Sequence, residues 1–214
     1  MHTNRAFDGT TEEALEIARA NPLATLTVWD GERLQSLQAP LVPVMSEAGA
    51  LIAFEGHAPL ASRLVRALEG QARVAATAIF SGPDAYVSPN SYASKAENAR
   101  VVPTWNFESA EADGHLELIF DRDVLHDILD RQTAAYEATF RPNWALDDAP
   151  LTYVHALMNA ICAIRLTVNA ITATRKLSQN KSDADFNGVI NGLLAQDDYK
   201  ARAVAARMSE LERG

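Results

Sequence analysis

Short segments rich in apolar and β-branched residues recur along the chain, separated by Gly, Asp and Pro pairs, which is the pattern of an antiparallel β protein. Residues 23–44 contain an Asp30-Gly31 pair and predict a hairpin. SGPD at residues 81–84 and Ala112-Asp113-Gly114 predict turns between neighbouring strands. Further strands are predicted at residues 50–55, 73–80, 85–88, 101–109, 115–120 and 160–177.

Apolar positions with helical spacing fall between these strands. Thr10 and Glu13 form a capping box before a short helix that ends at Asn21-Pro22. Asp121 caps a longer helix, and Ser182 with Asp185 caps another. Helices are also predicted at residues 59–69 and 151–160 and up to about residue 212, with a helical turn within residues 89–100.

The order of these elements bounds the fold. Strict alternation of strand and helix is missing, so a doubly wound parallel sheet is not expected. Seven or eight short strands with hairpin turns favour an α+β, mainly antiparallel protein, a split (Greek-key) β-barrel with peripheral helices. We expect residues 1–181 to form this barrel with its inserted helices. Residues 182–214 are expected to form a C-terminal helical segment packed on the barrel or on a dimer partner.

The net charge of the chain bears on whether it binds nucleic acid. The 214 residues carry a formal net charge of −9, although residues 165–214 by themselves carry a slight positive excess. An acidic protein repels nucleic-acid phosphates, and no segment resembles a helix-turn-helix with a basic recognition helix. Direct DNA binding is therefore doubtful.

Several other classes of site and location are also disfavoured. No apolar run reaches the roughly 18–20 residues that span a bilayer, and the acidic N-terminus does not resemble an export signal, so we expect a cytoplasmic protein. The single cysteine, Cys162, rules out an internal disulfide and is expected to be a small buried hydrophobe. Dinucleotide, P-loop, GxSxG and HExxH motifs are missing, and the five histidines do not cluster, so no metal site is expected.

Two segments concentrate hydrogen-bonding chemistry, VVPTWN at residues 101–106 and KLSQN at residues 176–180. In the first, Trp105 is either a core aromatic or a wall beside a flat ring, with Thr104 and Asn106 on the opposite strand face. In the second, the side chains are either a solvated junction with caps or ligands of a phosphate or polar ring edge. We expect both segments to form one site for a small planar ligand that carries phosphate. The side chains that the second segment contributes are Lys176, Ser178, Gln179 and Asn180.

A third segment, GHAPLASR, begins the helix expected at residues 59–69. Helix N-termini bind anions through free N–H groups and the helix dipole. His57, Ser62 and Arg63 could add side-chain donors to such a site, although a plain turn with a surface arginine fits the segment as well.

These segments, with AIFSGPDAYVSP, SYASKAE and a following GVINGL, resemble the PaiB family, whose members are described as FMN-binding negative transcriptional regulators. The resemblance runs from about residue 21 to residue 194. It implies a split barrel related to flavin-binding oxidoreductases, assembled as a homodimer with FMN in a groove between subunits. It places Thr104, Trp105 and Asn106 on one family motif, Lys176, Ser178, Gln179 and Asn180 on another, and His57 at a Gly-His segment that holds phosphate in related barrels.

The chain also departs from the family pattern. Gln38 stands where the family usually has a histidine, and Glu111 and Tyr136 fall in two further segments where the family often has one. Three functional hypotheses therefore stay open. The first is a flavin-dependent redox protein or sensor. The second is a negative regulator of transcription without a recognisable DNA-binding motif. The third is a divergent barrel without flavin, or one that binds haem or another planar ligand, with His57 or His155 as the axial ligand.

Overall fold

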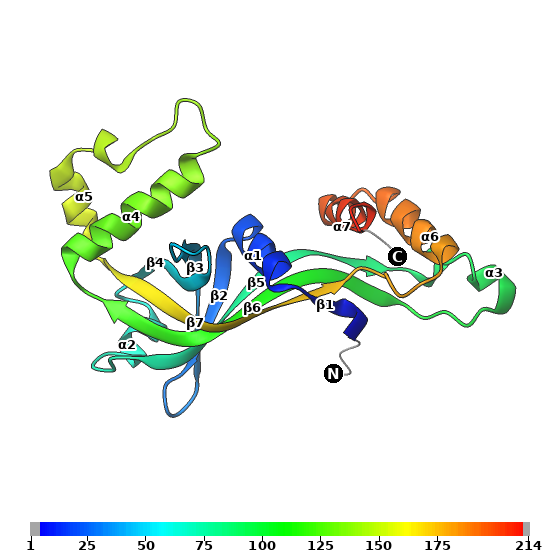
Figure 1. The fold of residues 1–214 in the computed structure, drawn as a ribbon, viewed down its shortest axis with the longest axis horizontal. Coiled ribbons are helices and arrows are strands. Elements are labelled where there is room, and N and C mark those ends of the chain that lie inside the picture. The colour runs from blue at the N-terminus through cyan, green and yellow to red at the C-terminus, as the bar shows by residue number, and fades with distance from the viewer. Residues whose placement is uncertain (1–4, 212–214) are drawn as a thin grey trace. The chain divides into compact units, whose positions relative to one another are not determined.

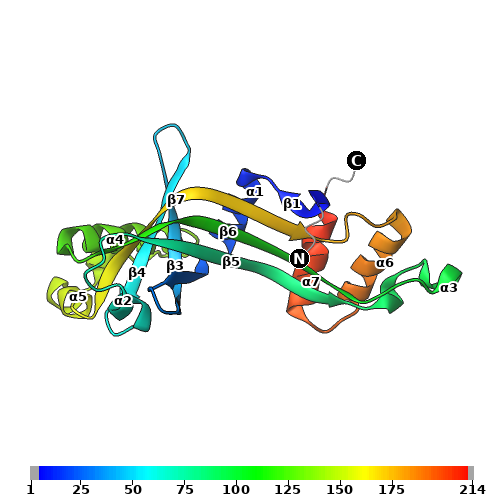
Figure 2. The same ribbon diagram turned by 90° about the horizontal axis from the view of Figure 1, so that it is seen from below.

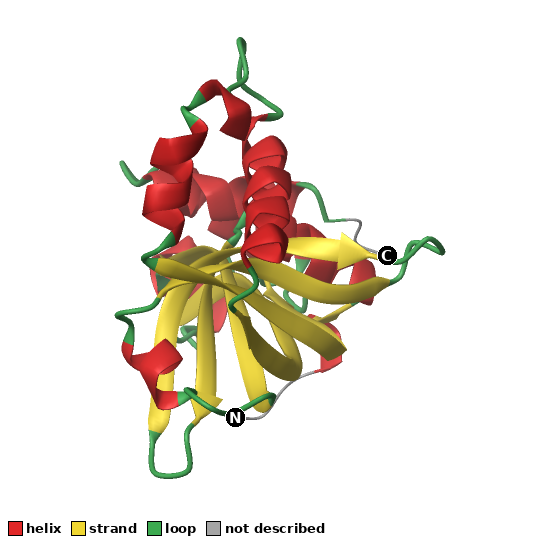
Figure 3. Ribbon diagram, turned by 90° about the vertical axis from the view of Figure 1, so that its left-hand side faces the viewer, coloured by secondary structure: helices red, strands yellow, loops and turns green. Residues whose placement is uncertain are grey.

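The structure is a computed structural model that describes residues 5–211. In this range one seven-stranded sheet runs in the order β1-β7-β4-β3-β2-β5-β6, and an additional pairing of β7 with β6 closes six of the strands into a ring (Figure 3). The fold is thus the expected α+β, mainly antiparallel split β-barrel. The strands are β1 Asp8–Gly9, β2 Leu23–Trp29, β3 Leu34–Met45, β4 Leu51–Pro59, β5 Val74–Val87, β6 Thr104–Ile119 and β7 Ile161–Lys176.

Helices join these strands at most of the places that the sequence predicts. Three single-turn helices, η1 Arg5–Phe7, η2 Pro89–Ser91 and η3 Leu146–Asp148, accompany them. The α-helices are α1 Thr11–Ala20, α2 Arg63–Ala67, α3 Lys95–Asn98, α4 Arg122–Glu137, α5 Leu151–Met158, α6 Asp183–Leu194 and α7 Tyr199–Ser209. None of the described helices is long and apolar enough to cross a bilayer.

Side-chain caps fix the helix starts. Thr10 and Glu13 form the predicted reciprocal box, with the Glu13 N–H donating to Thr10 Oγ1 at 3.2 Å and the Thr10 N–H to Glu13 Oε2 at 2.7 Å. Asp121 accepts from the first turn of α4, and Ser182 accepts the Asp185 N–H of α6. The predicted β2–β3 hairpin is confirmed, with Trp29 opposite Leu34.

The described chain groups into two compact units, each treated separately below. The first comprises Met1–Ala18, Ser81–Ala110 and Thr172–Gly214, and the second comprises Arg19–Phe80 and Glu111–Ile171. In the first unit α6 and α7 lie side by side (Figure 1) and bury a core with the loop around η2. That core contains Ala85, Val87, Tyr92, Leu177, Phe186, Val189, Leu193, Ala201, Val204, Ala205 and Met208.

The second unit holds α4 against β3 and β4 (Figures 1 and 2). Phe54 and Phe80 stack obliquely, with ring centroids 4.7 Å apart. A further cluster joins α4, η3 and α5 and contains Leu125, Ile128, Leu146, Val154, Met158 and Ala163. Cys162 is fully buried, as expected, and burial raises the pKa of its thiol.

Two predicted turns are wrong. β5 runs without a break through residues 81–84, and β6 runs through residues 112–114. Each of these turns was predicted because of a glycine. In the structure, both glycines instead lie where the backbone of a neighbouring strand comes close. A Cβ on Gly114 would lie 2.0 Å from the Thr167 carbonyl oxygen, and one on Gly82 would lie 3.0 Å from the Glu108 carbonyl oxygen.

The helix predicted at residues 59–69 is also corrected. Gly56 to Pro59 continue β4, because they pair with Ile164 to Ile161 of β7. α2 is therefore only Arg63–Ala67, capped by Ser62, whose hydroxyl accepts the Val65 N–H at 3.2 Å. His57 consequently lies on a strand and not at a helix N-terminus.

Candidate functional site

A pocket of about 230 Å³ in the first unit brings together five of the residues expected from the sequence. They come from the start of β6, the end of β7 and the loop that follows β7. The pocket is lined by Phe7, Tyr92, Val102, Pro103, Thr104, Asn106, Lys176, Ser178, Asn180 and Lys181. The two distant motifs thus converge on one cavity within a single unit.

Strand alternation places the β6 residues. Because successive side chains point to opposite faces, Thr104 and Asn106 share the face that lines the pocket. The Lys176 ammonium, at the end of β7, donates to Thr104 Oγ1 at 2.6 Å. A lysine ammonium has three N–H donors, so this bond leaves donor capacity for an anion in the pocket.

Asn106 and Ser178 line the pocket and are also hydrogen-bonded to each other. Asn106 is fully buried, with its amide nitrogen 3.0 Å and its amide oxygen 3.1 Å from Ser178 Oγ. Ser178 has a left-handed backbone with φ of 62°, which is uncommon for a residue other than glycine. This pair therefore fixes the strained turn after β7, and its contribution is structural in the first place.

Two predicted residues face elsewhere. The Trp105 indole N–H donates to Asp84 Oδ1 at 3.1 Å, and its ring meets Tyr86 edge-on at 6.0 Å. Gln179 is used locally, since its side chain accepts the Leu177 N–H and donates to the Ala6 carbonyl at 2.9 Å. Neither side chain lines the pocket.

Tyr92 and Lys181 belong to the pocket and were missed in the sequence. Lys181 Nζ lies 5.1 Å from the centroid of the Tyr92 ring, within cation–π range. Lys181 directly follows the KLSQN motif, and Tyr92 lies in the SYASKAE segment, which contributed to the family resemblance but was given no role in the site. The ionisable side chains that line this pocket in the described range are Tyr92, Lys176 and Lys181, and the Asp185 carboxylate of α6 interacts electrostatically with both Tyr92 and Lys181.

A buried ion-pair network stands on β6, two residues beyond Asn106. The Glu108 carboxylate is 2% exposed and accepts from Arg175 Nε at 2.6 Å and from Arg207 Nε at 2.7 Å. Arg175 also pairs with Glu13. Burial acts to lower the pKa of Arg175, but its bonds to Glu108 and Glu13 raise the pKa overall. The network joins β6, β7, α1 and α7. Because two arginines neutralise the Glu108 carboxylate, its negative charge would not repel an anionic ligand in the pocket.

The remaining predicted residues lie in the second unit. His57 is half-buried on β4, and its Nδ1 is 2.8 Å from the Gln132 amide oxygen on α4. Ser62 caps α2, and Arg63 is the exposed first residue of that helix. His155 is exposed on α5. Among the described residues no group of three or more His, Cys, Asp or Glu side chains could hold a metal ion.

Comparison with known proteins gives the chain its family. The family model described as "Putative FMN-binding domain" matches residues 1–170, which includes VPTWN and ends before KLSQN. The chain is 29% identical over 209 residues to an uncharacterized protein of Emericella nidulans, covering 83% of each chain. It is also 30% identical over 133 residues to the protease synthase and sporulation protein PAI 2 of Bacillus subtilis. That alignment covers 62% of this chain and 61% of the Bacillus protein.

A solved structure supports the fold. The FAD and heme binding protein from Mycobacterium smegmatis superimposes with a TM-score of 0.55 at 16% identity, over 78% of this chain and 71% of that one. At such identity the likeness concerns the fold alone. Because the family model spans residues 1–170, the chain belongs to the family of the "Putative FMN-binding domain", the PaiB family that its two motifs predicted.

Proposed function

We propose that this protein binds a flavin, FMN in the first instance, with the pocket of the first unit as part of the site. The observation that carries the proposal is the meeting of two lysines, an aromatic ring and uncharged hydrogen-bonding groups in one pocket. The family description and the flavin-binding protein of the same fold favour a flavin over other anions.

Each group in the pocket has a chemical part in this proposal. Lys176 and Lys181 neutralise the phosphate, while Thr104 and Asn180 give it direction through hydrogen bonds. Tyr92 offers a ring against which a flat group packs. The flavin, when bound, would supply the redox chemistry, and the protein would supply binding, orientation and electrostatics.

The pocket also bears on assembly. Its volume of about 230 Å³ is below the roughly 300–1,000 Å³ of pockets that enclose a whole ligand of drug size. We therefore propose that a second copy of the chain covers the rest of the flavin in a homodimer. Trp105 would lie at the border of this site. By family position only His57 is a phosphate-binding candidate in the second unit, with Ser62 and Arg63 following it in the chain.

The first experiment is the absorption spectrum of the freshly purified protein. The two-band spectrum of an oxidised flavin supports the proposal, whereas a Soret band favours haem. If the protein is colourless, FMN is titrated into the wild type and into Lys176→Ala. Loss of one charge-assisted hydrogen bond should weaken binding roughly tenfold or more.

The matched control is Lys95→Ala, which removes an exposed lysine of the same unit from α3 and should leave FMN affinity unchanged. Arg63→Ala tests the second-unit residues in the same titration. Equal affinity of the wild type and Lys176→Ala would exclude the proposed site. Absence of flavin binding by the wild type would exclude the proposed function.

A regulatory role, if present, is proposed to be indirect. The net charge of −9 opposes binding to phosphate backbones. We propose that any effect on transcription passes through the ligand or a partner protein. Tight sequence-specific binding in a gel-shift assay at moderate salt would contradict this.

A further inference from the structure

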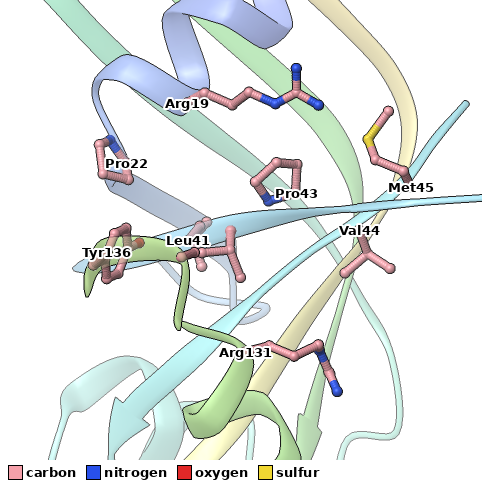
Figure 4. Close-up of a pocket in the computed structure, with 10 residues that line it drawn as sticks. Arg19, Pro22, Leu41, Pro43, Val44, Met45, Arg131 and Tyr136 are labelled. Atoms are coloured by element: carbon pink, nitrogen blue, oxygen red, sulfur yellow. The ribbon is translucent and has the colours of Figure 1, made fainter. Parts of the chain in front are cut away.

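The second unit contains a larger cavity that the flavin proposal does not use. Its volume is about 590 Å³, within the range of roughly 300–1,000 Å³ typical of small-molecule sites. Figure 4 shows it around the second half of β3, with Arg19 from the end of α1 on one side and side chains of α4 on the other. The lining residues are Arg19, Pro22, Leu41, Val42, Pro43, Val44, Met45, Arg131, Ala135 and Tyr136.

The charge of this cavity is positive. Arg19 and Arg131 line it, and none of the lining residues in the described range carries a carboxylate. Arg131 is half-exposed and pairs with the buried Glu55 carboxylate at 2.6 Å, which Arg165 also contacts at 2.6 Å. One acid thus serves two guanidinium groups. The Arg19 guanidinium is exposed and has no carboxylate partner among the described residues, so the cavity favours an anion.

Tyr136 contributes an unsatisfied hydroxyl. Its oxygen is buried and has no hydrogen-bond partner of acceptable geometry within the described chain. The neighbouring Gln132 is already engaged at both ends, with its amide oxygen at His57 Nδ1 and its nitrogen donating to the Pro40 carbonyl at 2.6 Å. Burial raises the pKa of the Tyr136 hydroxyl, an effect that nearby Gln132 partly offsets. Buried hydroxyls without partners are rare in native proteins, so this one indicates that a ligand or a water molecule binds here.

The β3 edge explains why a small molecule fits better here than a peptide strand. β2 pairs with β3 only as far as Pro40, and the Leu41 N–H then donates to the Pro22 carbonyl at 2.9 Å. Beyond Leu41, that edge of β3 has no strand partner in the described range. Pro43 has no N–H to donate, and the register shifts between Val44 and Met45, two features that oppose strand addition.

From these observations we infer that the second unit binds a small organic carboxylate with an apolar body, in a site separate from the flavin pocket. The carboxylate meets the Arg19 guanidinium, whose planar fork matches it with two hydrogen bonds. The apolar body lies on Leu41, Pro43 and Met45, and the Tyr136 hydroxyl gains its missing partner from a polar atom of the ligand.

Benzoate is a suitable probe, with benzamide as its uncharged counterpart and inorganic phosphate as an anion without an apolar body. Titration calorimetry of the full chain should detect benzoate binding, with benzamide and phosphate at least roughly tenfold weaker. Arg19→Gln should weaken benzoate binding roughly tenfold or more, and Tyr136→Phe by several-fold. Equal binding of benzamide and benzoate, or no benzoate binding, would overturn the inference.

Two controls separate a ligand site from other causes. Arg66→Gln, an exposed change on α2, should leave benzoate affinity unchanged. Tyr136→Phe should unfold at the same or a higher temperature than the wild type, because the lost hydroxyl has no partner to leave behind. FMN should not displace benzoate, and Arg19→Gln should retain FMN affinity. Displacement of benzoate by FMN would overturn the separateness of this site while leaving flavin binding itself intact.

Discussion

At the scale of single residues, the KLSQN motif does two different jobs. Lys176 and Asn180 line the pocket with side chains that are open to a ligand, while the side chains of Ser178 and Gln179 form hydrogen bonds that fix the turn. The sequence could not separate these roles, because a hydroxyl or an amide beside a cation serves equally well as ligand or as cap. Burial distinguishes them, since Ser178 is 4% exposed and bonded to a fully buried partner.

Asn106→Ala tests the structural role of Ser178, because Asn106 is its hydrogen-bond partner. The change leaves the buried Ser178 hydroxyl without its partner and opens a small void, so unfolding should become easier by about 1–3 kcal/mol. Urea denaturation followed by circular dichroism measures this. The control Asn187→Ala, on the exposed face of α6, should change stability by less than about 0.5 kcal/mol. Equal effects of the two changes would show that the Asn106–Ser178 pair contributes nothing specific.

At the scale of elements, the sequence predicted a turn at Gly114, but β6 continues through this residue, and the backbones of β6 and β7 lie close together there. Gly114 lies where β6 passes the backbone of Thr167, so any side chain at this position must push the two strands apart. Gly114→Ala should therefore destabilise the second unit by more than about 2 kcal/mol. Thermal unfolding measures this, with Glu117→Ala on the exposed side of β6 as the control. A Gly114→Ala protein as stable as the control would contradict the close approach.

The segment between η2 and α3 is attached to α6 by one carboxylate. The Ser94 N–H and hydroxyl each donate to Asp185, both at 2.9 Å, and the backbone hydrogen bond is the main reason why the pKa of Asp185 lies below its ordinary value of 3.8. A lowered pKa stabilises the fold above the ordinary value and loses that contribution as pH falls through the folded-state value.

The melting temperature of Asp185→Asn should accordingly lie below that of the wild type at neutral pH, because the neutral amide is a weaker acceptor. The difference should begin to shrink as the pH falls below 3.8 and should be lost as the pH passes through the lower pKa that Asp185 has in the folded protein. Differential scanning calorimetry of both proteins across this range is the measurement. A difference of constant size would mean that the Asp185 charge is not what matters.

At the scale of the whole molecule, the homodimer is the proposal with the widest consequences. Three apolar side chains of the first unit are exposed near the motif on β6, namely Tyr86 at 46%, Val102 at 74% and Trp105 at 48%. If a second copy covers them, Trp105→Ala should shift sedimentation velocity profiles towards monomer at low protein concentration, since buried aromatics dominate interface energies. Trp144→Ala, a comparably exposed tryptophan of the second unit, should leave the profile unchanged. A monomeric wild type at all concentrations would end the proposal.

Much of the architecture was present in local sequence signals. Capping residues such as Thr10, Asp121 and Ser182 act within a few residues of themselves, so the helix starts could be predicted. The Asp30-Gly31 hairpin was equally local. The turns predicted at Gly82 and Gly114 were wrong because a glycine in the sequence indicates either a backbone with unusual φ or a site where another backbone comes close. Which of the two applies depends on a strand that is distant in sequence.

The sequence by itself determined the antiparallel barrel class, the caps and the two motifs, because each depends on neighbouring residues and on residue chemistry. Only the tertiary structure decided that Tyr92 joins the lysines, that Trp105 turns to Asp84, and that Arg19, Pro43 and Tyr136 surround one cavity. These are contacts between residues far apart in the chain. They follow from strand pairing and helix packing, whose geometry no local pattern of polar and apolar residues encodes.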